Sequence, residues 1–208
     1  MPRTKNTTFA LPEKGGARRR AGCILSHRMP GADDVELLQD TASLNMRAQR
    51  VGERIKVEVL VTNEKAGHHI PTDHPARNIL LVVSAIDARG QELECLSNQL
   101  IPDWGGKGDA PDDYAGQPGK GYAKILEELW TEISPTAAYW RQIILREDTR
   151  IPALATDVTH YEFRAPEDSG PITIEAKLIF RRAFKELARQ KKWDMTDILM
   201  EQRTILVR

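Results

Sequence analysis

The chain has 208 residues, of which 40% are apolar and 29% charged, a composition that supports a packed core and excludes a wholly disordered protein. The net charge at pH 7 is zero, so no overall field favours nucleic acid as a partner. No apolar run approaches the roughly 18 residues needed to span a bilayer, and no transmembrane segment is expected. The two ends are basic and the middle is acidic, which predicts solvated tails or, alternatively, a docking surface.

The first part of the chain has the composition of irregular structure. Residues 1–34 are dominated by Pro, Gly, Thr and Arg and show no periodicity, so we predict an irregular N-terminal extension over residues 1–45. Residues 33–49 are ambiguous and are compatible with either a short helix or a strand. The N-terminal stretch lacks the apolar segment that a secretory signal carries.

Strand patterns dominate the middle of the chain. In residues 54–63, valines and isoleucine alternate with polar residues, which is typical of a half-buried strand. Residues 78–87 are apolar on both faces and predict a central strand. A turn follows at residues 88–91, so residues 91–98 are expected to return as its hairpin partner. Further strands are predicted at 141–148, 157–166 and 171–182. The spacing favours a mainly β fold, an immunoglobulin-like antiparallel β-sandwich over residues 46–182.

Two segments interrupt the β pattern. The insertion 102–140 begins with a Gly-, Asp- and Pro-rich loop and contains a helical spacing of apolar residues at 122–130. Residues 183–208 predict a C-terminal helical tail, with 204–207 as a possible edge strand. The loop aromatics are expected to cover the core or, alternatively, to line a partner surface: Trp104, Tyr114 and Tyr122. Buried packing is expected for three others: Trp130, Trp140 and Trp193.

A series of short motifs runs through the β region in a fixed order. A strand ending in VTN is followed by 66-AGHHIPTD and by Pro75-x-Arg77, and later come 147-EDTRIPA and a strand containing Asp157, Tyr161 and Phe163. This order resembles the C-terminal β-sandwich part of bacterial multihaem c-type cytochromes, in which a GHxxPTG loop follows the first long strand and a DTRxP element precedes a later one. The chain departs from that pattern at Asp73, where the family commonly has Gly.

The N-terminus resembles the same family. Met1-Pro2-Arg3 is similar to the residues that follow the family's last CxxCH haem motif, and 26-SHRMPG is similar to its later Ser-His-Arg-Phe-Pro-Gly element. The resemblance implies that the chain corresponds to the end of a longer cytochrome, through truncation, gene fission or a mis-assigned start. It also implies a periplasmic or extracellular protein, whereas the chain as written, without a signal peptide, is expected in the cytoplasm.

Covalent attachment of haem c needs two thiols and an adjacent histidine in a CxxCH motif. The two cysteines here, Cys23 and Cys95, are far apart, and the stretch from Cys23 to His27 has the spacing CxxxH. We therefore expect no haem bound covalently by this chain. Haem c by association with another segment or chain is still possible, because a neutral imidazole can complete the coordination of iron held elsewhere.

The resemblance implies where such an imidazole would come from. His27 lies in the Ser-His element that can supply a distal ligand in the family, with a surface histidine as the alternative. His68 occupies the family's Gly-His position, so the resemblance implies that it orders its loop or contacts a neighbouring haem. With the adjacent His69, these residues are the candidate haem-binding positions.

A metal site is a second interpretation of the same histidines. Imidazoles suit Zn²⁺ or Cu²⁺, so His68, His69 and His74 form a candidate ligand set, with Asp73 as an oxygen ligand and His160 as a distant fourth. Adjacent side chains in an extended run point apart, so this set needs a turn between His68 and His69. The alternative is that the loop residues stabilise a turn through backbone hydrogen bonds.

Other polar residues predict structural roles. Arg77 and the Asp148-Thr149-Arg150 element are expected to clamp loop carbonyls or a carboxylate. Asp109, Asp112 and Asp113 lack the regular spacing of a calcium loop. No nucleophile elbow, phosphate-binding loop or zinc-protease motif is present, so independent catalytic activity is not expected.

Three functions follow from these observations. The first is a non-catalytic accessory domain of a multihaem cytochrome, which packs against a haem-bearing segment or subunit, supplies an axial histidine and docks redox partners in electron transfer. The second is a freestanding Cu- or Zn-binding β-sandwich, and the third is a metal-free interaction module.

Overall fold

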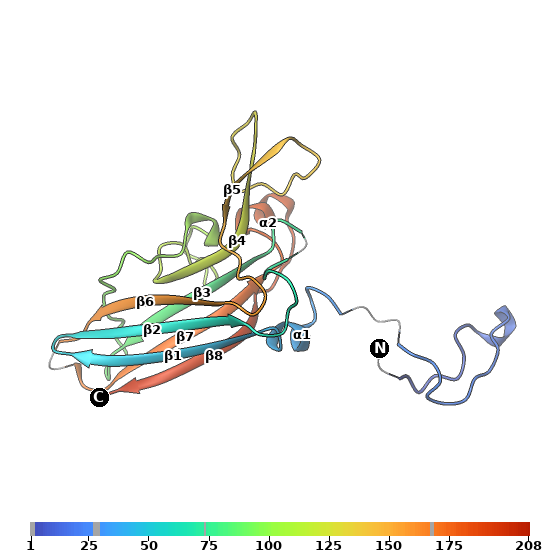
Figure 1. Cartoon of the computed structure of the whole chain (residues 1–208), viewed down its shortest axis with the longest axis horizontal. Coiled ribbons are helices and arrows are strands. Elements are labelled where there is room, and N and C mark those ends of the chain that lie inside the picture. Colours follow the sequence, from blue (N-terminus) through green and yellow to red (C-terminus); the bar gives the residue numbers. More distant parts are fainter. Residues whose placement is uncertain (1–2, 27–29, 73, 167–168) are drawn as a thin grey trace. The chain divides into compact units, whose positions relative to one another are not determined.

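The structure is a computed structural model that describes residues 3–26, 30–72, 74–166 and 169–208 (Figure 1). The chain divides into two compact units, residues 1–33 and residues 34–208. The first unit is built from turns, with one 3₁₀ turn, η1 (Pro12–Lys14), and a β-bridge between Arg3 and Leu25. The amide N–H of Thr4 donates to the Ile24 carbonyl at 2.8 Å, so the two ends of this unit lie side by side.

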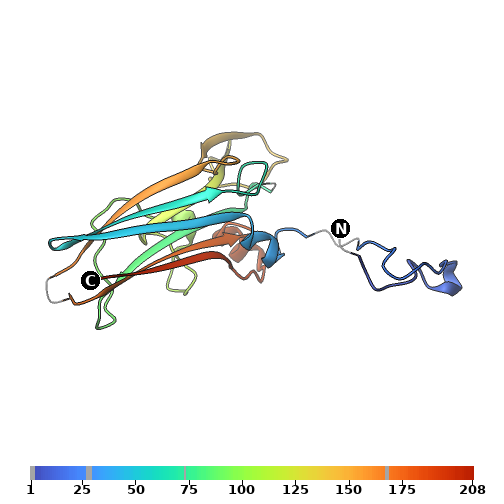
Figure 2. The same ribbon diagram turned by 60° about the horizontal axis from the view of Figure 1, so that its bottom comes forward.

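The second unit is a β-sandwich of two antiparallel sheets (Figure 2). The three-stranded sheet has the order β1 (Ala42–Val51), β2 (Arg54–Asn63), β6 (Thr156–Arg164). The five-stranded sheet has the order β5 (Ile143–Asp148), β4 (Gly119–Glu128), β3 (Asn78–Ile86), β7 (Ile172–Arg181), β8 (Ile198–Val207). The prediction of a mainly β, antiparallel sandwich is confirmed.

The core lies between the two sheets and follows the period-2 pattern of the strands. Ile55, Val57, Val59 and Val61 of β2 are all buried, as their alternation predicts. On the opposite sheet, alternate residues of β7 between Ile172 and Leu178 are buried. Because the buried side chains of the two strands project from facing sheets, their burial supplies the main hydrophobic stabilisation of the sandwich.

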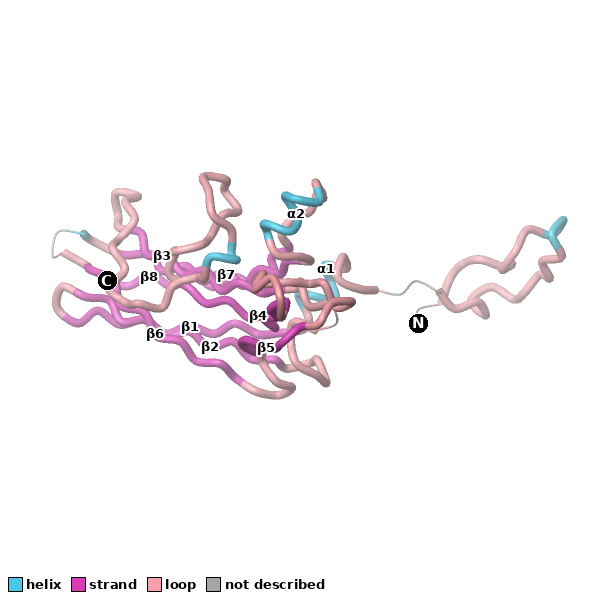
Figure 3. Tube along the Cα trace, turned by 90° about the horizontal axis from the view of Figure 1, so that it is seen from above, coloured by secondary structure: helices cyan, strands magenta, loops and turns pink. Residues whose placement is uncertain are grey.

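The central strand β3 is covered on its outer face as well, as its apolar sequence predicts. The loop after it contributes Ile101, Trp104 and Tyr114, which pack against Leu80 and Ile179. Figure 3 shows this loop and the helix α2 (Lys185–Lys191) on the outer side of the five-stranded sheet. The loop aromatics therefore cover the core, as one of the two interpretations proposed.

The predicted helix at residues 122–130 is wrong, because this segment is part of strand β4. Residues 119–123 of β4 pair with Asn78–Val82 of β3, residues 124–128 pair with β5, and the strand ends at Glu128, just before Leu129. Most residues of β4 are buried, including Tyr122 and Ala123 on successive positions. A strand covered on both faces has apolar residues at odd and even positions, and their spacing here coincided with that of a helix.

The C-terminal tail is helical only over α2 and then forms the ten-residue strand β8. β8 pairs with β7 and is the last strand of the five-stranded sheet, so it is an edge strand. The predicted edge strand therefore exists and is longer than residues 204–207.

In the N-terminal region, the ambiguous stretch contains both predicted elements. Helix α1 (Val35–Gln39) is followed by β1, which begins at Ala42 within the segment predicted to be irregular.

Residues 91–98 do not form the predicted hairpin strand. After one bridge between Ile86 and Glu92, the segment crosses to the other sheet, where the Leu96 N–H donates to the Glu162 carbonyl at 2.7 Å. Its pairing with β3 ends where the Leu93 N–H donates to the Ala85 carbonyl at 2.8 Å, beyond the stretch Asn78–Val82 that pairs with β4. Among the described residues, no helix is long and apolar enough to cross a membrane.

Candidate functional site

The histidine loop, residues 64–77, joins β2 to β3 and is fixed by a buried asparagine. Asn63, the last residue of β2, is fully buried and donates from Nδ2 to the carbonyls of His68 at 2.8 Å and of Ile151 at 3.1 Å. Ile70 and Ile151 exchange two backbone hydrogen bonds, of 2.9 and 3.0 Å. The GHHIPT and DTRIP motifs, about 80 residues apart in the sequence, therefore lie side by side.

The second motif has the structural role that its sequence predicts. Arg150 holds Asp148 through two side-chain hydrogen bonds of 2.6 and 2.8 Å, and these bonds lower the pKa of Asp148 below its ordinary value. The Thr149 hydroxyl donates to the Gly121 carbonyl at 2.9 Å. In the histidine loop, the Arg77 guanidinium donates to the Thr72 carbonyl at 3.3 Å, which confirms the predicted clamp on a loop carbonyl.

Asp157, noted in the later strand motif, joins the two sheets. It accepts hydrogen bonds from Tyr122 at 2.8 Å and from Lys120 at 2.6 Å, both on β4, whereas Asp157 itself is on β6. Burial is the main cause that raises the pKa of the Tyr122 phenol well above its ordinary value, and the carboxylate beside it acts in the same direction. The tyrosine is therefore a neutral hydrogen-bond donor, and the cluster is an inter-sheet tie.

The four described histidines occupy different environments. His68 and His69 are exposed in the loop, and Nδ1 of His68 lies 3.1 Å from the carbonyl oxygen of His69. His74 is half-buried: its Nδ1 accepts from the Ala76 N–H at 3.3 Å, and its ring meets the Tyr139 ring edge-on at 6.3 Å. His160 is exposed on β6 with Nε2 3.5 Å from Glu58.

The structure does not bring His160 to the histidine loop. His160 is four residues along β6 from Thr156, which lies level with Thr62 near the loop, a separation of roughly 13 Å along the strand. Among the residues that the structure describes, no group of three or more His, Cys, Asp or Glu side chains is arranged to hold a metal ion. His27 and Asp73 lie outside the described residues. The haem and metal roles of these histidines stay predictions.

The carboxylates of the long loop have cationic partners within the fold. Asp113, with 1% of its side chain exposed, accepts two hydrogen bonds of 2.6 Å from Arg189 of α2, and Asp112 is paired with Lys185. Arg181 pairs with Asp197 at 2.8 Å and lies 5.1 Å from the Tyr114 ring centroid. These contacts anchor residues 102–118 to α2 and β7.

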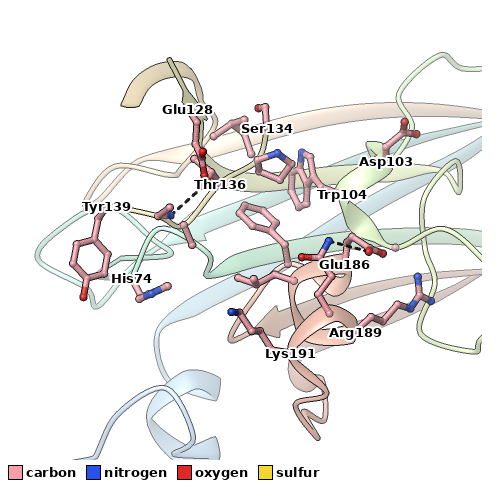
Figure 4. Close-up of a pocket in the computed structure, with 18 of the residues that line it drawn as sticks. His74, Asp103, Trp104, Glu128, Ser134, Thr136, Tyr139, Glu186, Arg189 and Lys191 are labelled. Atoms are coloured by element: carbon pink, nitrogen blue, oxygen red, sulfur yellow. Dashed lines mark hydrogen bonds between the residues drawn. The ribbon is translucent and has the colours of Figure 1, made fainter. Parts of the chain in front are cut away.

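A groove of about 1160 Å³ lies next to the histidine loop (Figure 4). We name it the aromatic groove. Its walls are the 3₁₀ turn η2 (Asp103–Gly105), the loop joining β4 to β5, and α2. Trp104 and Phe184 meet edge-on at 5.5 Å on one side, and His74 and Tyr139 lie on another. His74 therefore belongs to both the histidine loop and the aromatic groove, which meet at this residue.

The burial predicted for three tryptophans is wrong. Trp130, Trp140 and Trp193 expose 82%, 72% and 50% of their area, because they lie in the connection between β4 and β5 and just after α2, where no further layer covers them. Trp140 and Trp193 line the aromatic groove. The sequence signal that indicates this surface is the density of aromatic residues outside the alternating strand patterns.

Comparison with known proteins identifies a shared fold. No family model matches the chain, and neither does any curated protein. A solved structure that it resembles is a penta-heme cytochrome c552 from Thermochromatium tepidum, with a TM-score of 0.65 and 19% sequence identity. The match covers 91% of this chain and 44% of that protein, so the chain spans less than half of the length of its structural neighbour. The chain therefore has a multihaem cytochrome-like fold, a β-sandwich shared with part of a penta-heme cytochrome.

Proposed function

We propose that this chain is a non-catalytic accessory domain of a multihaem cytochrome electron-transfer assembly. A haem-bearing segment or subunit docks at the end of the sandwich that carries the histidine loop and the aromatic groove. The fold shared with a penta-heme cytochrome and the joining of the GHHIPT and DTRIP motifs support this assignment. By the resemblance of its motifs, the assembly belongs to the periplasm or the cell exterior.

The observation that carries the proposal is the state of the His68 imidazole. Its Nδ1 lies 3.1 Å from the His69 carbonyl oxygen, which only accepts, so the tautomer that donates from Nδ1 would present the Nε2 lone pair to a ligand. The side chain is exposed, and Asn63 fixes its backbone. An accessible imidazole with Nε2 directed away from its own backbone contact would fit the requirements of an axial ligand to iron held by another segment.

The chain's own residues would orient and shield the docked group. Haem iron, when bound, supplies one-electron transfer. His68 would present Nε2 to it, and the groove aromatics Tyr139 and Trp140 would remove water from the contact. Because both aromatic side chains are largely exposed, covering them on docking would be favourable.

Titration with a haem peptide tests the axial role. The probe is a haem undecapeptide prepared from a cytochrome c by proteolysis, which has an open axial position, and the readout is its visible spectrum. Adding the purified chain should convert high-spin to low-spin iron. We expect His68→Ala to abolish this change and His160→Ala, which removes another exposed histidine on β6, to preserve it. Low-spin conversion of equal size with the His68→Ala protein, or no conversion with wild type, contradicts the proposed ligation.

A further inference from the structure

One edge of the five-stranded sheet is covered and the other is open. At the β8 edge, the Arg203 guanidinium donates to the Leu44 carbonyl of β1 at 2.9 Å, so strands of the two sheets meet there. The opposite edge strand, β5, pairs with β4, and within the described residues no strand pairs with its outer side. An edge strand with free backbone N–H and C=O groups is a template for pairing with another strand.

Apolar side chains gather beside this open edge. We name residues 129–145 the arm; they comprise the loop from β4 to β5 and the start of β5, and they project from the sandwich in Figure 1. Large apolar side chains of the arm that are more than a third exposed are Leu129, Trp130, Ile133, Tyr139, Trp140, Ile144 and Leu145. Along β5, Ile143–Leu145 are apolar, whereas the exposed Arg146, Glu147 and Asp148 carry the charges that natural edge strands usually present to solvent. Tyr139 and Trp140 meet edge-on with ring centroids 5.2 Å apart, and exposed apolar side chains gathered in one segment mark an interaction site.

We infer that the arm and the outer edge of β5 pair with the same surface of a second copy of this chain, in a two-fold antiparallel arrangement. A two-fold contact needs a surface that complements itself, and an antiparallel edge strand meets this condition through its backbone. The pairing would join the five-stranded sheets of two copies into one continuous sheet. This inference concerns self-association and does not depend on the haem-docking role.

The exposed aromatic side chains of the arm supply roughly half of the area that a stable dimer buries on each partner. Its three aromatic side chains expose 67–82% of their area. At roughly 150–250 Å² for each ring, they offer on the order of 450 Å². Four aliphatic side chains and the strand edge add to this, against about 800 Å² per partner in a typical stable interface.

The hydrogen-bond pattern of the β4–β5 pair identifies the central residue of the contact. The Leu129 N–H donates to the Gln142 carbonyl at 3.0 Å, and backbone groups alternate in direction along an antiparallel strand. Ile144 therefore directs its N–H and C=O toward β4, whereas Leu145 directs them outward. A two-fold axis at Leu145 places this residue opposite its counterpart in the second copy. Leu145 and Trp130 do not line the aromatic groove, whereas Tyr139 and Trp140 of the arm do, so the residue at the two-fold axis can be changed without altering the groove lining.

Sedimentation equilibrium of the full chain tests the inference at concentrations on the order of 100 µM. We expect wild type to dimerise. Leu145→Lys, which places two ammonium groups opposite each other, should weaken dimerisation by at least about tenfold. The matched control is Leu206→Lys on β8, because Leu206 is 57% exposed and Leu145 56%; it should dimerise like wild type.

A backbone variant makes the test specific for strand pairing. Leu145→Pro removes an N–H that points away from β4, so the fold should tolerate it, as edge strands tolerate proline, while dimerisation is lost. Circular dichroism checks that each variant is folded. A wild type that stays monomeric, dimers that persist in both Leu145 variants, or equal weakening by Leu206→Lys would overturn the inference. The haem-peptide spectrum of the Leu145→Lys protein should match that of wild type, which separates the two proposals.

Discussion

At the residue scale, Asn63 determines the geometry of the candidate site. Its side-chain amide binds carbonyls from two segments that are distant in sequence, and it does so from a fully buried position. The VTN sequence identified this position only as the end of a strand. What the side chain binds depended on where Ile151 lies, because hydrogen bonds between distant segments have no local sequence pattern.

Replacing Asn63 tests whether this residue holds the histidine loop. Asn63→Ala removes both hydrogen bonds, one to the buried Ile151 carbonyl and one to the part-buried His68 carbonyl, so we expect the free energy of unfolding to fall by about 1–3 kcal/mol. Urea denaturation followed by circular dichroism measures it. Asn98→Ala, at an exposed asparagine, is the control and should change stability by less than about 0.5 kcal/mol. Equal stability of the two variants would show that the buried amide does not stabilise the loop.

At the scale of elements, the long loop 102–118 is a fixed part of the fold. A Gly- and Pro-rich sequence of this length indicates mobility or function, yet its carboxylates and carbonyls bind cations from α2 and β7. A methyl group at Gly106 or Gly108 would approach the Asp113 carboxylate closely, and both glycines have positive φ. The glycines therefore allow the backbone to wrap around a buried acid, which the composition alone did not indicate.

Removing the cation beside Asp113 should loosen this loop. Arg189→Ala leaves a carboxylate with 1% side-chain exposure without its ion-pair partner, so we expect a loss of about 3 kcal/mol in the free energy of unfolding. Amide hydrogen exchange should also speed up at residues 105–116. Arg182→Ala, an exposed arginine of the same region, serves as the control and should leave both measurements unchanged. Unaltered exchange in the Arg189→Ala protein would show that the ion pair does not anchor the loop.

At the scale of the whole molecule, the two units carry opposite charge. Residues 1–33 have seven Lys or Arg and two acids, whereas residues 34–208 have 23 Lys or Arg and 28 acids. The net charge of zero is therefore the sum of a basic N-terminal unit and an acidic sandwich. The core strands β1 to β8 all belong to the second unit, which has an apolar interior of its own.

Deletion of residues 1–33 tests whether the sandwich folds by itself. Because the paired strands lie entirely in residues 34–208, we expect the fragment to unfold cooperatively, with a melting temperature within about 4 °C of the full chain. Differential scanning calorimetry on both proteins measures this. A fragment that aggregates, or that melts without a cooperative transition, would mean that the N-terminal unit is needed for the sandwich to fold.

The sequence by itself determined the class of the fold and the position of most strands. The alternating apolar residues of β2 and β7 indicate strands that are buried on one face, and the continuous apolar run of β3 indicates a strand that is buried on both faces. Such periodicity is visible in the sequence alone. The order of the GHHIPT and DTRIP motifs likewise indicated the cytochrome-like fold that the structural neighbour shares.

Only the tertiary structure decided which segments meet and which side chains stay exposed. Residues 119–128 form strand β4 because they pair with β3 and β5. Residues 91–98 cross to the opposite sheet, where Leu96 bonds to Glu162. The tertiary structure left Trp130 and Trp140 in solvent on the arm and brought His74 to the aromatic groove. The physical reason is that burial, strand pairing and groove formation depend on contacts between residues far apart in the chain, which no local pattern encodes.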